Sequence, residues 1–201
     1  MKKLVLSFLA LLLFIISTTY APAPATAATK YDFKNVNWGM TVNQVKKKEK
    51  SKILETVKSK DFTYVVYKTK GFRKNANLYY LFYKNKLVRA MYVFDPNNTN
   101  GTTRDLISEY FSLKRDLFDT YEGSINNRDI LNRSGKRVTP YEGEEKDLAA
   151  GKISYQCYWI VDKKKTHISL SLSIFGSFLI NRVIYSDNSL DFDIDELMDS
   201  M

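Results

Sequence analysis

The single histidine, His167, is the first candidate for catalysis. It shares one face of a predicted strand with Ser169 and Ser171, and Asp162 precedes it. A Ser-His-acid hydrolase needs its histidine within hydrogen-bond reach of the nucleophile. Side chains two residues apart on a strand lie about 7 Å apart and point in parallel, which does not suit direct proton transfer. We therefore expect a partly exposed sheet histidine, and a weak hydrolase centred on His167 is the less favoured alternative.

The single cysteine, Cys157, lies in the run Tyr-Gln-Cys-Tyr-Trp. It alternates with Tyr155 and Trp159, so its position indicates a buried structural thiol rather than a nucleophile. One cysteine forms no intramolecular disulfide. An exported protein of this sequence is therefore held together by its core alone.

An acidic run, Asp191-x-Asp193-x-Asp195-Glu196, is similar to the start of a calcium loop but lacks the glycine and the distal glutamate of that motif. We expect a solvated acidic tail in which Asp193 caps a short helix. The sequence has no phosphate-binding glycine loop, zinc-ligand spacing or nucleophile elbow. It therefore predicts a non-enzymatic protein without catalytic residues, metal or cofactor.

The aromatic content of the predicted strands favours a binding role. The first strand of a hairpin over 78–94 is apolar on both faces, with Leu78, Tyr80 and Phe82 on one face and Tyr79, Leu81 and Tyr83 on the other. Helices cover one face of a sheet in a two-layer fold. The second face is then covered by other parts of the chain, buried with central strands, or exposed as a tyrosine-rich interaction surface. For an exposed face, the expected binding residues for an unknown protein partner are Tyr67, Tyr79, Tyr83 and Arg89.

The chain is basic, with a formal net charge of +9 that becomes +7 without Lys2 and Lys3. This charge favours anionic polymers or lipid headgroups outside the cell over nucleic acid, because the chain carries an export signal. The alternative to a protein partner is therefore electrostatic association with an anionic envelope polymer or membrane surface. The expected contact residues are Lys46, Lys47, Lys48, Lys50 and Lys52.

Residues 1–27 are typical of a secretory signal peptide. Lys2 and Lys3 precede an apolar run over 4–16, and a small polar region ends in an Ala-x-Ala site with cleavage expected after Ala27. Cleavage after Ala28, or retention of the segment as a membrane anchor, is the alternative. The apolar run is short for an anchor, because a spanning helix needs about 20 apolar residues. We therefore expect an extracytoplasmic protein.

The apolar pattern predicts strands over 62–69, 153–161, 166–174 and 179–185, besides the hairpin over 78–94 with Asn85 in its turn. A helix is predicted over 42–51 after Thr41, with an extension to 57 as an alternative. A longer helix is predicted from a cap at Thr102 or Thr103 to a stop at Gly123.

This order of elements predicts an α+β fold of two αβββ units, with helices packed on an antiparallel sheet. The first unit and the second helix occupy 28–123. A polar loop occupies 124–152, and we expect it to be a disordered insertion, with a mobile functional loop as the alternative. A second three-stranded segment occupies 153–186, and an acidic tail occupies 187–201.

Residues 38–45, Trp-Gly-Met-Thr-x-x-Gln-Val, resemble the signature that opens small extracytoplasmic α/β modules. These modules include the SmpA/OmlA-type lipoproteins of the outer-membrane barrel-assembly machinery and the β-lactamase-inhibitor-like modules. Residues 78–82 and 86–92 are similar to the strand pair of uncharacterised secreted bacterial proteins that begin Trp-Gly-Met. The chain lacks the lipid-bearing cysteine of the lipoproteins. The resemblance implies the fold, an exported location and a binding role, with no catalytic residues.

Overall fold

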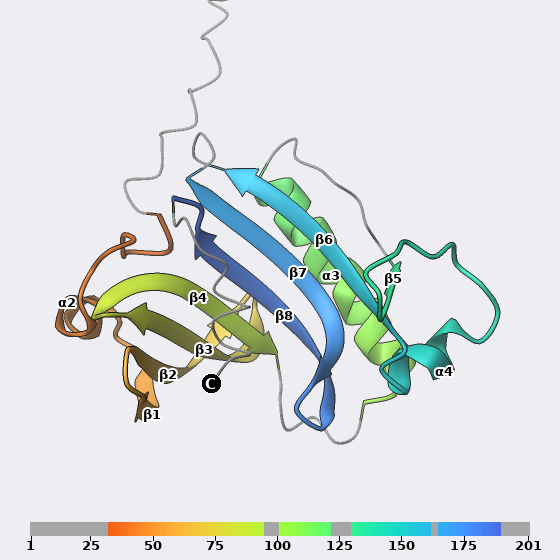
Figure 1. Cartoon of the computed structure of the whole chain (residues 1–201), viewed down its shortest axis with the longest axis horizontal. Coiled ribbons are helices and arrows are strands. Elements are labelled where there is room, and N and C mark those ends of the chain that lie inside the picture. The colour runs from red at the N-terminus through yellow and green to blue at the C-terminus, as the bar shows by residue number, and fades with distance from the viewer. Residues whose placement is uncertain (1–31, 95–100, 122–129, 162–164, 190–201) are drawn as a thin grey trace, which may run out of the picture.

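One antiparallel sheet forms most of the computed structural model, which describes residues 32–94, 101–121, 130–161 and 165–189 (Figure 1). Its strand order is β1-β2-β3-β4-β8-β7-β6-β5, so β4 and β8 pair at the centre. The strands are β1 (Lys52–Lys58), β2 (Phe62–Gly71), β3 (Lys74–Tyr83), β4 (Lys86–Phe94), β5 (Ile130–Asn132), β6 (Ile153–Val161), β7 (Thr166–Phe175) and β8 (Phe178–Asp187). The strands and the hairpin predicted from the sequence are confirmed. The hairpin turn places Asn85 in the left-handed region, with φ of 63°.

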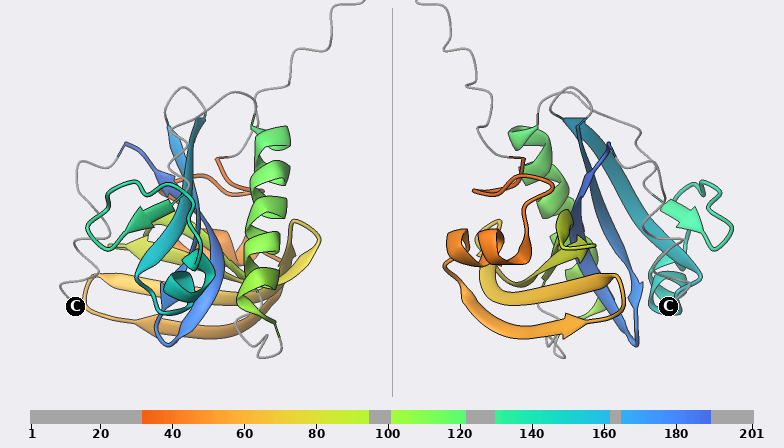
Figure 2. Two further views of the ribbon diagram at one scale, coloured as in Figure 1. Left: turned by 90° about the vertical axis from the view of Figure 1, so that its right-hand side faces the viewer. Right: turned by 60° about the vertical axis from the view of Figure 1, so that its left-hand side comes forward.

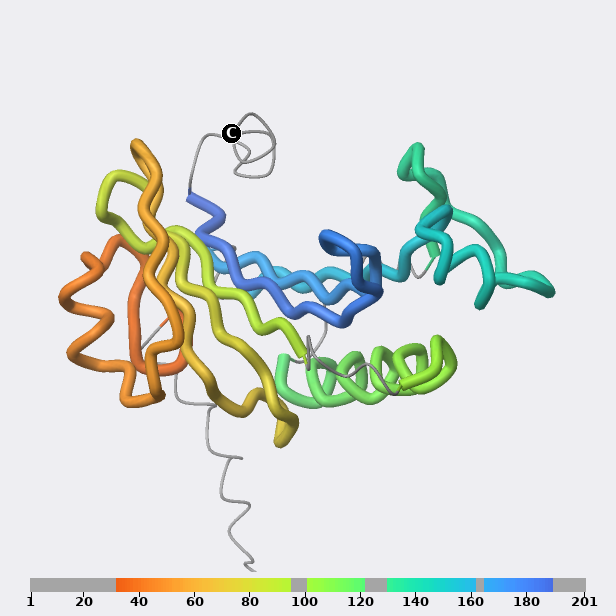
Figure 3. The backbone as a smooth tube through the Cα atoms, turned by 90° about the horizontal axis from the view of Figure 1, so that it is seen from below, coloured from red at the N-terminus to blue at the C-terminus, as the bar shows by residue number. Residues whose placement is uncertain are grey.

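The helices divide the sheet into two unlike faces. Helices α2 (Val42–Lys48) and α3 (Thr103–Thr120) lie on the same face, which we call the helix-covered face, and α4 (Glu144–Ala149) packs beside β6 (Figure 2). Their buried side chains join inward residues of β2 to β8 in one core. The side chains that alternate with this core lie on the opposite face, which we call the open face. The strands twist across the sheet, so β1–β4 and β6–β8 run in different directions (Figure 3).

The long helix α3 begins at the predicted cap. The Thr102 hydroxyl accepts from the Asp105 N–H at 3.2 Å, and the Asp105 carboxylate accepts from the Thr102 N–H at 2.8 Å. This capping box satisfies two N–H groups that a helix start leaves unpaired. The predicted stop, Gly123, lies outside the described residues. The fully buried face of the helix carries Tyr110, Leu113 and Leu117.

The predicted fold class, an α+β arrangement of two αβββ units, is wrong. Four strands, β1 to β4, follow α2, and every described strand belongs to one continuous sheet. The few helices do not pack as two matching units. The physical reason is the pairing of β4 with β8, which joins strands far apart in the sequence and which no local pattern reveals.

The predicted helix over 42–51, with its extension to 57, is wrong beyond Lys48. Glu49 has extended backbone angles, and residues 52–58 form β1. Ile53 and Val57 are β-branched, and such side chains favour strands. Residues 130–152, where we expected a disordered insertion, contain β5 and α4.

The Trp-Gly-Met run has a structural role. The Trp38 indole N–H donates to the Thr166 hydroxyl at 3.0 Å, which ties the start of the described chain to β7. Gly39 has φ of +80°, which suits glycine, and its N–H donates to the Leu87 carbonyl at 2.8 Å. The run therefore attaches the segment before α2 to both halves of the sheet.

The carboxylate of Glu49, directly after α2, is buried against the core. One oxygen of Glu49 accepts from Lys34 Nζ at 2.8 Å and from the Tyr80 hydroxyl at 3.1 Å, and the other accepts from the Ser51 N–H at 3.0 Å. Burial alone raises the pKa of Glu49. The hydrogen bonds from Lys34 and Ser51, with the Lys34 charge, outweigh burial and lower this pKa from 4.5 to about 2.

We expect Glu49→Gln to lower the free energy of unfolding at neutral pH by about 2 to 3 kcal/mol, because the charged hydrogen bonds are lost. The folded-state pKa lies below the unfolded value of 4.5, so this stabilisation is complete above pH 4.5 and disappears as the pH falls toward 2. Urea unfolding of both proteins between pH 7 and pH 2 measures the difference. The exposed Glu142→Gln variant is the control, and a constant gap between the Glu49→Gln and unsubstituted proteins across this range would contradict the assignment.

Candidate binding groove on the open face

Two neighbouring rows of side chains cross the open face. Residues in a row are direct partners on adjacent strands, so each side chain contacts that of its partner on the next strand. The first row is Glu55, Val66, Tyr79, Met91 and Ile184, and the second is Val57, Tyr64, Leu81 and Arg89. The alternation of each strand therefore gathers a mostly apolar surface from five strands.

A groove of about 290 Å³ lies over these two rows. Val66 and Leu81 are buried in it, whereas Tyr79 and Met91 are half-buried. Phe175, at the end of β7, completes its apolar lining. This volume is at the low end for ligand pockets, so the groove suits a few side chains of an extended segment.

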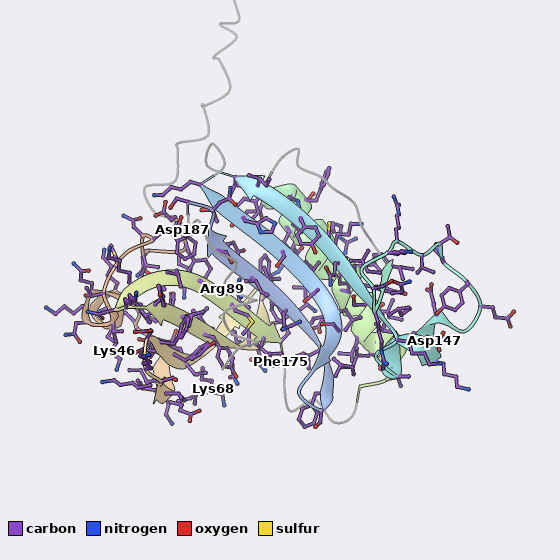
Figure 4. The ribbon with its side chains drawn as sticks, in the orientation of Figure 1. Lys46, Lys68, Arg89, Asp147, Phe175 and Asp187 are labelled. Atoms are coloured by element: carbon purple, nitrogen blue, oxygen red, sulfur yellow. The ribbon has the colours of Figure 1, made fainter. Side chains whose placement is uncertain are left out.

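Two arginines give the groove a positive side at the central strands. Arg89 Nε donates to the Ser186 hydroxyl at 3.1 Å. Arg182 donates to the Ser173 hydroxyl at 2.8 Å, and its guanidinium carbon lies 4.8 Å from the centroid of the Phe175 ring. These contacts help to orient both guanidinium groups beside the groove. Figure 4 shows Arg89 and Phe175 on the face turned to the viewer.

The structure brings together some of the predicted binding residues. Tyr79 and Arg89 line the groove. Tyr83 is half-buried beside it and packs on Phe62, with ring centroids 5.1 Å apart.

Tyr67 is not part of this surface, contrary to the grouping expected from the sequence. It is 1% exposed on the helix-covered face, because it is an odd number of positions from Tyr64 and Val66 on β2. Burial and the Glu49 charge raise the pKa of Tyr67 to about 12.

The lysines predicted to meet an anionic surface lie along one continuous stretch. Lys46, Lys47 and Lys48 form the last turn of α2, and Lys52 begins β1. Lys46 Nζ donates to the Thr56 hydroxyl at 3.4 Å, a neutral acceptor. Lys50 lies between α2 and β1 and donates to the Lys47 carbonyl. The stretch is separate from the groove lining (Figure 4).

His167 lies half-exposed on the open face, and its ring stacks on Tyr158 at a centroid distance of 5.4 Å. Asp162 lies outside the described residues. Cys157 is fully buried, which confirms the burial predicted for it. Within the described ranges, no group of three or more His, Cys, Asp or Glu side chains is placed to hold a metal ion.

The sequence did not reveal the groove residues that come from β1, β7 and β8. Glu55 and Val57 were assigned to a helix extension, and Arg182, Ile184 and Phe175 reach the groove only because β8 pairs with β4. The local signal at Phe175 is an apolar residue before Gly176 in a hairpin turn, where a polar side chain is usual.

No family model, no curated protein and no solved structure matches this chain. None of the helices in the described part of the chain combines the length and the apolar character needed to cross a membrane.

Because the two faces of the sheet differ in burial, we expect truncation of a tyrosine on each face to lower the free energy of unfolding by unequal amounts. We expect Tyr67→Ala to lower the free energy of unfolding by about 3 to 5 kcal/mol, because it leaves a cavity in the core. We expect Tyr79→Ala to cost about 1 kcal/mol, because Tyr79 is half-exposed on the open face. Urea unfolding at pH 7 measures both, and equal costs would mean that the open face is as buried as the core.

Proposed function

We propose that this chain is an exported, non-enzymatic binding module that holds an extended segment of a protein partner in the groove on its open face. The observation that carries the proposal is the row of partly exposed apolar side chains across β1–β4 and β8. Exposed apolar surface of this kind is typical of interaction sites. The export signal at residues 1–27 supports an extracytoplasmic location.

The chemistry of the groove defines the partner segment. Apolar side chains of the partner pack on the half-buried Tyr79, Met91 and Ile184. Carboxylates of the partner pair with Arg89 and Arg182, since guanidinium groups bind carboxylates with charge-assisted hydrogen bonds. A segment in which apolar and acidic residues alternate satisfies both requirements, because an extended chain sends alternate side chains in opposite directions.

A fluorescein-labelled twelve-residue peptide of alternating Leu and Asp tests this proposal. We expect saturable binding, measured by fluorescence anisotropy, to the chain that begins at residue 28. A peptide of alternating Leu and Lys should bind at least about tenfold more weakly, because like charges oppose it at the arginines.

Met91→Asp places a charge on the groove floor, and we expect it to weaken binding of the Leu/Asp peptide about tenfold or more. Phe118→Asp on α3 is the matched control, since Phe118 is 51% exposed and lies outside the groove lining. Arg182→Glu is a second test that leaves the apolar floor intact. Circular dichroism establishes that each variant is folded. Equal affinity of the folded Met91→Asp and Phe118→Asp variants would refute the groove as the binding site.

Electrostatic association with an anionic surface is the second candidate function. It is favoured by the continuous lysine stretch at Lys46, Lys47, Lys48, Lys50 and Lys52, which lies apart from the groove. Polybasic segments of this kind bind anionic lipid surfaces with about 1 kcal/mol per lysine.

We expect the chain to sediment with vesicles that contain phosphatidylglycerol but not with vesicles of phosphatidylcholine alone. Replacing Lys46, Lys47 and Lys48 by Gln should weaken this binding about 100-fold, at about 1 kcal/mol per lysine. Replacing Lys114, Lys136 and Lys146 by Gln is the matched control. Binding that does not weaken with added salt would rule out this mode, because surface electrostatics are screened.

A further inference from the structure

We propose that the acidic segment 190–201 of this chain occupies the open-face groove of its own molecule. This inference rests on the proposed function, because it assigns a first occupant to the same groove. It adds that an external partner must compete with a ligand that the chain already carries.

The chain leaves the sheet beside the groove. Ser186, near the end of β8, is the direct partner of Arg89 and accepts its hydrogen bond at 3.1 Å. The Asp187 carboxylate then accepts from the Ser189 N–H at 3.0 Å and from the Ser189 hydroxyl at 2.6 Å. This local turn ends the strand just before residue 190, close to the positive side of the groove. Figure 4 shows Asp187 and Arg89 at this end of β8.

The segment has enough length to cover the groove. Arg182 lies four positions before Ser186 on β8, which is about 13 Å along a strand. The twelve residues of 190–201 span up to about 40 Å when extended. Less than half of the segment therefore suffices to return along β8 from the turn to Arg182.

The composition of the segment complements the groove. The solvated tail and the helix capped by Asp193 that the sequence predicts lie outside the described residues. The apolar and acidic residues of the segment alternate over 190–195, so an extended backbone would place Leu190, Phe192 and Ile194 on one side and three aspartates on the other. The segment carries five carboxylates and no basic residue: Asp191, Asp193, Asp195, Glu196 and Asp199. The described lining offers an apolar floor, Arg89 and Arg182, against the single acid Glu55.

Covalent attachment makes weak contacts sufficient. A short linker presents an attached segment at an effective concentration on the order of millimolar. A segment with millimolar intrinsic affinity therefore covers the groove about half of the time. An external partner displaces the segment only if its affinity for the groove is higher than that of the segment, or if the partner is present at high concentration.

Disulfide trapping in the chain that begins at residue 28 tests the proposal. Ile194→Cys is combined with Met91→Cys on the groove floor, and a disulfide forms only when the two Cα atoms approach within about 7 Å. Ile194→Cys with Lys165→Cys is the matched control, because Lys165 is exposed and lies beside the exit of the segment, where its carbonyl accepts from Asn188. Cys157 stays in place because it is buried.

We expect the Ile194→Cys/Met91→Cys pair to form an intramolecular disulfide at least about fivefold faster than the control pair. Added salt, or replacement of Asp191, Asp193 and Asp195 by Asn, should slow it. An equal or slower rate than the control overturns the proposal. Disulfide-linked dimers overturn it as well, because they place the segment in the groove of a second copy.

The peptide titration separates this inference from the proposed function. Neutralising the three aspartates should tighten binding of the Leu/Asp peptide up to about twofold, because a competitor that occupies the groove about half of the time is weakened. If the disulfide fails to form while peptide binding still depends on Met91, the self-docking proposal falls and the proposed function stands. If the disulfide forms and no peptide binds even the neutralised chain, the proposed function falls and self-docking stands.

Discussion

The pairing of β4 with β8 is the constraint on which the rest of the structure depends. It joins β1–β4 to β5–β8 as one sheet, so a single core extends beneath both sets of strands. The same pairing sets Arg89 opposite Ser186 and Met91 opposite Ile184. Without this register the groove would lose Arg182, which lies on β8, and Arg89 would lose the Ser186 hydroxyl that accepts its hydrogen bond. The core and the groove therefore both form when β4 pairs with β8.

The division of the sheet into two faces explains why an apolar surface remains for binding. The helices and the segment before α2 cover one face, where Glu49 is held as a charged group by Lys34 and Ser51. Strand alternation sends the other aromatic residues to the open face, where Tyr79 and Met91 stay half-buried. A polar open face would have needed no partner. An apolar open face favours an occupant, supplied either by another protein or by the chain itself.

Local patterns in the sequence predicted the elements but not their assembly. The cap at Thr102 and the turn at Asn85 could be predicted because each depends on a few neighbouring residues. The strand over 52–58 was missed, because its apolar spacing also fits a continuing helix. The predicted surface correctly contained Tyr79 and Arg89 but included Tyr67, whose face is set by strand register. Arg182 and Phe175 could not be assigned to the groove, because that requires knowing that β8 pairs with β4.

The central claim is that the open-face groove binds a segment of alternating apolar and acidic residues. A methionine methyl spectrum tests it most directly, because Met91 lines the groove and Met40 packs against the core on the other face. In a chain labelled with methyl-¹³C methionine, the account predicts that the Met91 resonance moves saturably as the Leu/Asp peptide is added, while the Met40 resonance stays fixed. An unmoved Met91 resonance in the presence of bound peptide, or equal movement of both, would contradict it.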